Sequence, residues 1–255
     1  VTACTLAGVD FGFNLLWAML LSIIATFILQ EMSARLGIVT QKGLADVIKQ
    51  ELHNPIIRNS VIALIFSAII IGNASYEAGN IGGATLGMEA LFGTNYSSLY
   101  PFVLGGLAFV LLYLGSYKAL EKVFIVLVLI MSLSFVMTAI LTKPNMWELL
   151  KGLLVPSVPK NGILTIIALV GTTVVPYNLF LHAALVSEKW KSKDDLNLAK
   201  RDTMVSIILG GLVSISIIIS AAAINSLEVN NVMGMAKALE PLYGSAALYF
   251  LGIGM

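Results

Sequence analysis

Long apolar runs without a charged residue constrain this chain more than any other feature. Each run covers at least 15 positions, and an α-helix needs about 20 apolar residues to cross the roughly 30 Å hydrocarbon core of a bilayer. Only helices and closed barrels satisfy every backbone polar group in lipid, and barrel strands alternate apolar with polar residues, which these runs do not. We therefore predict an all-α integral membrane protein. The expected spans are 11–30, 59–76 (continuing past Glu77 to Met88), 90–117, 123–142, 161–187, 203–227 and 241–255.

The composition agrees with a membrane protein and argues against several other classes. Hydrophobic residues make up 58% of the 255 positions, charged residues make up 11%, and the mean hydropathy is +0.93, whereas soluble domains carry about 25% charged residues. The net charge of +1 argues against a nucleic-acid partner, which would need a clustered basic surface. The sequence has no His-Glu-x-x-His, Gly-x-Ser-x-Gly or Walker pattern, which argues against a membrane enzyme.

Basic residues are distributed unevenly among the connections. The connections 31–58, 118–122 and 188–202 hold eleven of the fifteen Lys and Arg residues, and the other set holds four. Because positive charge is concentrated in cytoplasmic loops, we predict that the first set is cytoplasmic. Within it, residues 31–52 form either a short interfacial helix or an ordinary solvated connection.

The run 161–187 contains a predicted helix break. Its centre reads Gly-Thr-Thr-Val-Val-Pro-Tyr-Asn over residues 171–178, with a flexible glycine, four β-branched residues and then Pro176. Proline has no N–H for the carbonyl four residues earlier, which belongs to Thr172, and an unpaired carbonyl in the bilayer is costly unless something polar meets it. A bound cation would serve, since the carbonyl end of a half-helix carries partial negative charge and many secondary transporters build ion sites at such breaks. The alternative is a proline kink satisfied by a threonine hydroxyl or a water.

Two further groups of polar residues lie within the spans. Asn178 and His182 are four residues apart and share a face of the second half-helix. Asn73, Glu77 and Asn80 form an i, i+4, i+7 stripe in an otherwise apolar run. Ionisable groups inside membranes are rare and usually functional, so Glu77 and His182 are the predicted proton carriers or cation partners. The alternative for each is a structural side chain bonded to a neighbouring helix.

Three segments of the sequence match the pattern of a known family. Residues 171–182 read Gly-Thr-Thr-Val-Val-Pro-Tyr-Asn-Leu-Phe-Leu-His, residues 11–17 read Phe-Gly-Phe-Asn-Leu-Leu-Trp, and residues 33–40 read Ser-Ala-Arg-Leu-Gly-Ile-Val-Thr. They resemble the sixth-helix signature, the opening of the second helix and the connection after it in the Nramp divalent-metal transporters. The resemblance covers essentially the whole chain, from the end of the first helix into the eighth. Since the sequence starts at Val1 and stops inside an apolar run, we expect 1–255 to be a fragment of one transmembrane domain.

The resemblance implies an inverted-repeat, leucine-transporter-like helical bundle, with the first and sixth helices both broken around a central metal site. It places an Asp-Pro-Gly-Asn motif, which carries metal ligands, just before Val1. In the sixth helix the family uses a backbone carbonyl, here that of Thr172, and three residues later a methionine sulfur, here replaced by Val175. The metal-site candidates are Gly171, Thr172 and Val175, and the further polar lining comprises Asn73, Asn80, Tyr177 and Asn178. No resident cofactor is expected, because the metal ion is the substrate.

Three positions depart from the family pattern. Val175 removes a soft thioether that favours transition metals over Mg²⁺ and Ca²⁺, and it leaves room for an ion that keeps some of its water, as Mg²⁺ does. The chain therefore looks closer to the family's magnesium-transporting branch than to its manganese and iron carriers. Tyr177 stands in place of the first family histidine, with His182 as the second, and Ala74 replaces an aspartate three residues before Glu77. These positions are linked with the family's proton route, so both changes count against proton coupling.

The leading hypothesis is a secondary transporter in the cell membrane that moves a divalent cation, Mg²⁺ or Mn²⁺, by alternating access. A sodium-coupled organic-solute transporter of the same general fold is the main alternative, and it would need a roomier pocket. A passive channel is a third hypothesis, which uptake against a gradient would exclude.

Overall fold

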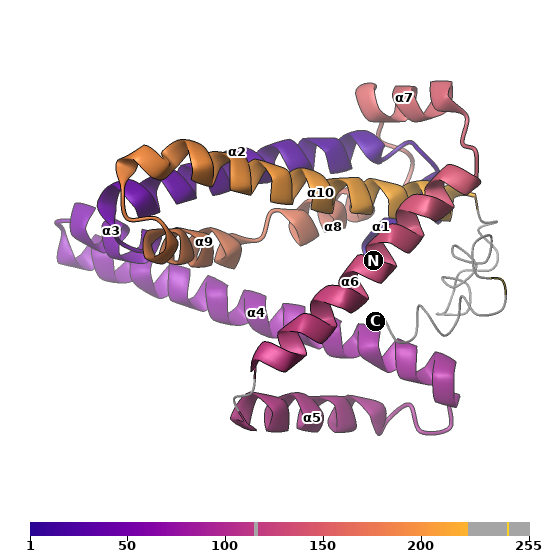
Figure 1. Cartoon of the computed structure of the whole chain (residues 1–255), viewed down its shortest axis with the longest axis horizontal. Helices are drawn as coiled ribbons and strands as arrows, with labels where there is room; N and C mark the ends of the chain where they lie inside the picture. The colour runs from indigo at the N-terminus through magenta and orange to yellow at the C-terminus, as the bar shows by residue number, and fades with distance from the viewer. Residues whose placement is uncertain (115–116, 224–243, 245–255) are drawn as a thin grey trace. The chain divides into compact units, whose positions relative to one another are not determined.

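The computed structural model describes residues 1–114, 117–223 and Gly244, and every regular element within them is a helix (Figure 1). In chain order the elements are α1 (Thr2–Phe11), α2 (Leu16–Thr40), α3 (Leu44–Glu51), α4 (Pro55–Phe92), α5 (Tyr100–Leu114), α6 (Tyr117–Leu141), α7 (Met146–Leu154), α8 (Ile163–Thr173), α9 (Pro176–Lys189), the short 3₁₀ helix η1 (Lys193–Asp195) and α10 (Leu196–Ala222). In this described part, five segments are long and apolar enough to cross a membrane. The predicted all-α, multi-pass membrane architecture is confirmed.

Residues 31–40 continue α2 and do not begin a connection, so the predicted end of the first span is wrong. Residues 31–40 contain no proline, and Glu31 forms an ion pair with Arg35 one turn later, at 2.5 Å. In this ion pair the charge of each side chain neutralises that of the other on the helix surface. The helix ends before Gln41, whose φ of 53° is left-handed. The separate short helix is α3, which packs against α9.

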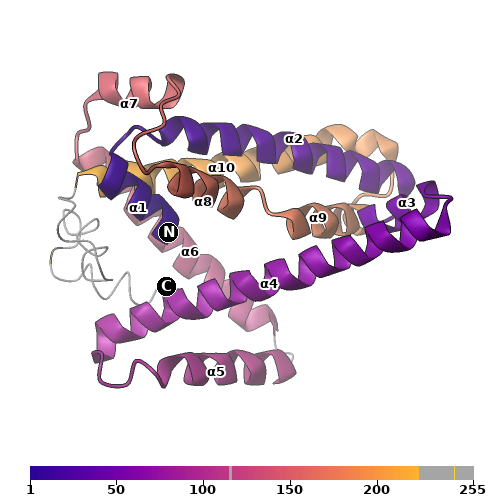
Figure 2. The same cartoon turned by 180° about the vertical axis from the view of Figure 1, so that it is seen from behind.

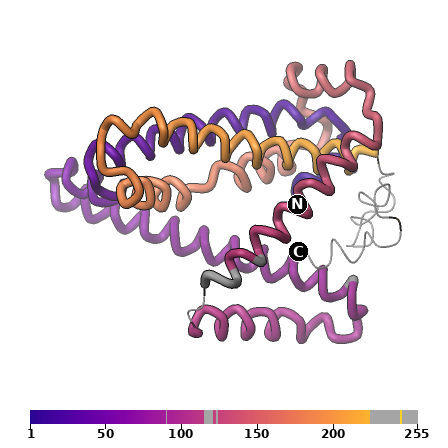
Figure 3. The backbone as a smooth tube through the Cα atoms, in the orientation of Figure 1, coloured from indigo at the N-terminus to yellow at the C-terminus, as the bar shows by residue number. Residues whose placement is uncertain are grey.

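The predicted run 90–117 does not form one span. Helix α4 is continuous over 38 residues (Figure 3) and ends before Gly93, where a φ of 84° turns the chain. The hydroxyl of Tyr100 donates a hydrogen bond of 2.9 Å to the Gly93 carbonyl and closes the turn, so α5 retains only 15 residues. Residues 118–122, predicted as a connection, lie within α6. The predicted span 241–255 lies outside the described residues, apart from one glycine.

The chain forms two compact units. The break unit, named for the interrupted helix within it, comprises residues 19–76 and 168–211. Among the described residues, the second unit comprises 1–18, 77–114, 117–167 and 212–223.

In the break unit, α2, α9 and α10 pack closely on one another. Gly37 of α2 lies directly against the backbone of Ala183 in α9, where a side chain has no room. The hydroxyl of Ser33 donates a hydrogen bond to the carbonyl of Leu179, again joining α2 to α9. Helices α2 and α10 lie side by side in both views (Figures 1 and 2). The buried core of this contact consists of Ala34, Ile38, Val186 and Ala199.

In the second unit, the connection after α7 is tied to the start of α2 and to the segment just before it. The indole Nε1 of Trp17 donates to the carbonyl of Ser157 at 2.9 Å, and the hydroxyl of Ser157 donates to the carbonyl of Asn14 at 3.2 Å. Helix α7 begins with a side-chain cap, because Asn145 accepts a hydrogen bond from the backbone N–H of Trp147 at 3.0 Å.

Candidate functional site

The break predicted in the run 161–187 is present. Helix α8 ends at Thr173 and α9 begins at Pro176, with an extended link between them (Figures 1 and 2). Val175 in this link has φ −98° and ψ 120°, which is strand-like backbone. Pro176 is the first residue of α9, a position where its missing N–H costs nothing to the new helix. The interruption therefore follows from the local sequence.

Because Pro176 has no N–H, this break leaves the carbonyl of Thr172 without the intrahelical donor that a continuous helix would supply. The hydroxyl of Thr172 points one turn back to the carbonyl of Ala168 at 2.9 Å, and that of Thr173 donates to the carbonyl of Leu169 at 2.8 Å. Neither hydroxyl satisfies the carbonyl that Pro176 frees. Among the described residues, no hydrogen-bond donor reaches the carbonyl oxygen of Thr172 or of Thr173. Thr172 is also exposed, so these two backbone oxygens are the unpaired acceptors at the end of α8.

The neighbouring carbonyl, that of Gly171, has a partner that the sequence did not predict. The hydroxyl of Tyr76, from α4, donates to it at 2.5 Å. The ring of Tyr76 also contacts the ring of Tyr177 edge to face, with centroids 6.1 Å apart and planes at 70°. Tyr76 directly precedes Glu77 in the sequence, but no spacing rule links it to a residue 95 positions away.

The side chain of Val175 is buried, with 7% of its surface exposed. Its carbonyl accepts a hydrogen bond from the N–H of Asn178 at 3.1 Å, within the first turn of α9. Within residues 1–114 and 117–223, no group of three or more His, Cys, Asp or Glu side chains is placed to hold a metal ion. The described part of the site therefore offers neutral backbone oxygens, which suit hard cations.

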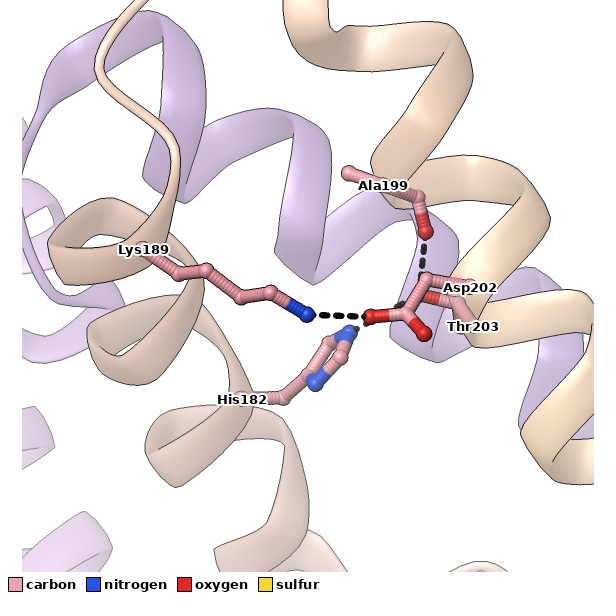
Figure 4. Close-up of polar contacts among 5 residues, drawn as sticks. All are labelled: His182, Lys189, Ala199, Asp202 and Thr203. Carbon is pink, nitrogen blue, oxygen red and sulfur yellow. Dashed lines mark hydrogen bonds and ion pairs between the residues drawn. The ribbon is translucent and has the colours of Figure 1, made fainter.

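The side chain of His182, in α9, contacts a polar side chain of α10. Its Nε2 lies 3.1 Å from the hydroxyl of Thr203, and that hydroxyl donates to the carbonyl of Ala199 at 2.9 Å (Figure 4). Two turns further along α9, Lys189 pairs with Asp202 at 2.9 Å, and both of these side chains are exposed. His182 is thus partly buried between α9 and α10, beside an ion pair at the end of α9. Thr203 was not predicted, because it is an ordinary polar residue at the start of an apolar run.

The predicted polar stripe of α4 is exposed. Asn73, Glu77 and Asn80 all present exposed side chains, and Asn73 belongs to the break unit whereas the other two belong to the second unit. Glu77 lines a groove of about 850 Å³ whose other walls come from α5 and α6. Glu121 is the second acidic residue of this groove, and the remaining lining is apolar. Glu121 was missed because residues 118–122 were predicted to form a connection.

The sequence model of the family described as Nramp, natural resistance-associated macrophage protein-like, matches residues 1–255. The divalent metal cation transporter MntH of Klebsiella pneumoniae (strain 342) is 30% identical over 261 residues, which cover 98% of this chain and 61% of that protein. MntH of Yersinia pestis (strain Pestoides F) is 31% identical, over 98% of this chain and 62% of that protein. The chain thus spans about three fifths of the length of these curated relatives.

The fold resembles that of a solved manganese transporter from Eremococcus coleocola. The structure of that protein in complex with an aromatic bis-isothiourea substituted compound aligns with a TM-score of 0.79 and 20% identity, covering 99% of this chain and 57% of the other. Its H236A mutant aligns with a TM-score of 0.74 and 23% identity over the same shares. The predicted leucine-transporter-like fold with broken helices is therefore confirmed.

Proposed function

The chain belongs to the Nramp family, and from that premise we propose that the full-length protein carries a divalent metal cation, Mg²⁺ or Mn²⁺, across the cell membrane by alternating access. The relatives named as MntH and as a manganese transporter support the divalent cation as the substrate. No resident cofactor is part of the proposal, because the metal is the cargo.

One observation carries the proposal. Thr172 is an exposed residue at a break in a helix long and apolar enough to span a membrane, and no donor among the described residues reaches its carbonyl oxygen. Inside a bilayer such an oxygen costs several kcal/mol unless it finds a partner. A cation that has lost part of its hydration shell is such a partner. The partial negative charge at the carbonyl end of α8 adds to the attraction between the cation and this oxygen.

The proposed coordination combines this carbonyl with ligands from elsewhere in the protein. The resemblance assigns further ligands to an Asp-Pro-Gly-Asn motif in the first helix, and Thr172 is the contribution of this half of the site. Val175 offers no sulfur, and its side chain is buried. Since a thioether is what discriminates against hard ions, we propose that Mg²⁺ is accepted as well as Mn²⁺.

Glu77 and His182 are the proposed proton carriers. His182 is partly buried and has a hydrogen-bonding partner in α10, which supports a relay role. Glu77 lies in an apolar groove with Glu121. Ala74 and Tyr177 depart from the family's proton route, and both changes count against proton coupling.

The experiment that tests this function is uptake by cells expressing the full-length protein. We expect saturable Mn²⁺ uptake against a concentration gradient, with competition by Mg²⁺ and none by amino acids. Absence of saturable uptake of either metal contradicts the proposal. Competition by amino acids with no effect of metals supports the organic-solute transporter instead.

A further inference from the structure

Among the described side chains, Tyr76 alone joins both halves of the broken helix, by a hydrogen bond to one half and an aromatic contact with the other. Its hydroxyl donates to the carbonyl of Gly171 in the last turn of α8. Its ring meets the ring of Tyr177, the second residue of α9. Tyr76 is partly buried at this position on α4. A single phenol therefore bridges the two ends that the break leaves apart.

This contact divides the carbonyl oxygens at the end of α8 into two classes. The last turn of any α-helix lacks intrahelical donors for its carbonyls. Here the carbonyl of Val170 is satisfied by the N–H of Val174 at 2.8 Å, and that of Gly171 by Tyr76. The carbonyls of Thr172 and Thr173 receive no donor from the described residues. Among the described residues, the phenol thus leaves Thr172 and Thr173 as the residues of this turn whose carbonyls have no donor.

We propose that Tyr76 is a positioning residue that sets the ion selectivity of the site by withholding the Gly171 carbonyl. This inference rests on the proposed function, since it concerns which divalent cation the Thr172 site accepts. Ca²⁺ takes six to eight oxygen ligands in flexible geometry, whereas Mg²⁺ demands six in a near-ideal octahedron. One additional movable carbonyl therefore favours Ca²⁺. The hydrogen bond from Tyr76 occupies one lone pair of the Gly171 carbonyl and holds this carbonyl towards α4, which selects against the larger ion.

The test substitution is Tyr76→Phe, and its matched control is Tyr100→Phe. Tyr76→Phe removes the hydroxyl and keeps the ring that meets Tyr177. Tyr100→Phe removes a hydrogen bond of the same kind, from a tyrosine hydroxyl to the carbonyl of Gly93 at 2.9 Å, in the second unit. The measurement is Mn²⁺ uptake by cells expressing the full-length protein, with the KM for Mn²⁺, the maximal rate, and the inhibition constant of Ca²⁺.

For Tyr76→Phe we expect the ratio of the Ca²⁺ inhibition constant to the KM for Mn²⁺ to fall by about threefold or more, so that Ca²⁺ inhibits more strongly. This is the size of effect expected from the loss of one modest hydrogen bond. The maximal rate should change less than this ratio. Tyr100→Phe should keep the wild-type ratio. A purely structural role of Tyr76 would lower the amount of active protein and the maximal rate without changing the ratio.

A second substitution separates the hydrogen bond from the ring. Tyr76→His retains a ring and an N–H donor, so it should stay closer to the wild-type ratio than Tyr76→Phe. If Tyr76→Phe does not reach the membrane, Tyr76→Met removes the same donor and the same comparison applies. An unchanged ratio in the donor-free variant, with normal wild-type uptake, overturns the role of Tyr76 and leaves the proposed function standing. Absence of saturable wild-type uptake overturns both.

Discussion

Nε2 of His182 lies 3.1 Å from the hydroxyl oxygen of Thr203, and this pair joins α9 to α10. The Thr203 hydroxyl already donates its proton to the carbonyl of Ala199, so its oxygen is left to accept. Nε2 of His182 therefore carries the hydrogen in this arrangement, and Nδ1 is the nitrogen left to take up a proton. The contact with α10 fixes the tautomer, which is the usual way in which a partner sets the role of a histidine.

Thr203→Val should slow proton movement that accompanies metal transport. The substitution keeps the shape of the side chain and removes the acceptor that holds the His182 ring, so we expect a decrease of about threefold, and a larger decrease for His182→Gln. The measurement is acidification of liposomes that contain the full-length protein, on addition of Mn²⁺.

Thr138→Val is the matched control for Thr203→Val. Thr138 is a buried threonine whose hydroxyl donates to the carbonyl one turn earlier, that of Ser134, at 2.8 Å. It should retain wild-type proton movement. Equal acidification by the wild type and Thr203→Val, or no acidification by the wild type, contradicts the assignment of His182 as a proton carrier.

Gly37→Ala should destabilise the contact between α2 and α9. A Cβ at this position would overlap the backbone oxygen of Ala183, and overpacking of this kind costs about 1–3 kcal/mol. In contrast, a Cβ at Gly72 of α4 meets nothing within 4 Å, so Gly72→Ala should be neutral or stabilise by up to about 1 kcal/mol through helix propensity. Thermal unfolding of the purified protein in detergent measures both. A Gly37→Ala variant as stable as Gly72→Ala would show that the close approach of the two helices is not present.

Val175→Met should shift the preference of the transporter from Mg²⁺ towards Mn²⁺. The substitution adds a soft thioether, which favours transition metals, at the position that the resemblance assigns to a metal ligand. Because Val175 is buried, we also expect a loss of about 1–3 kcal/mol in stability. Competition of Mg²⁺ against Mn²⁺ uptake measures the preference. The control is Val174→Met, at the partly buried neighbouring position, which should keep the wild-type preference. An unchanged preference between Mg²⁺ and Mn²⁺ in Val175→Met would contradict the role of position 175 in metal selectivity.

The features that the sequence predicted correctly rest on local chemistry. Pro176 lacks an N–H whatever its surroundings, so the break and the identity of the freed carbonyl, that of Thr172, follow from position alone. A helix over 146–154 was missed, although Asn145 followed three residues later by Glu148 is a local signal for a helix start. The error at 31–40 arose because charged residues were read as the end of a span, whereas Glu31 and Arg35 compensate each other on the helix.

The features that could not be predicted depend on packing between distant segments. Tyr76 and Gly171 are 95 residues apart, and their hydrogen bond exists only because α4 passes the end of α8 in the break unit. The partnership of His182 with Thr203 depends in the same way on the contact of α9 with α10. The burial of Val175 also depends on tertiary structure, since an apolar residue beside a helix break is equally compatible with exposure.

Pro176→Ala tests whether the unpaired carbonyl of Thr172 binds the ion. An alanine supplies the N–H that the carbonyl four residues earlier lacks, so the two half-helices can join and the oxygen is consumed within the helix. Stability should be retained, because proline is the poorest residue for a continuous helix. Pro55→Ala, at the first residue of α4, is the control, because an N–H at the start of a helix has no intrahelical partner.

The deciding measurement is the affinity of the purified full-length protein for Mn²⁺, by isothermal titration calorimetry, in the wild type, Pro55→Ala and Pro176→Ala. We expect wild-type affinity for Pro55→Ala and a loss of at least about tenfold, or about 1.4 kcal/mol, for Pro176→Ala. Wild-type affinity in a folded Pro176→Ala protein would contradict the binding of the ion by this carbonyl.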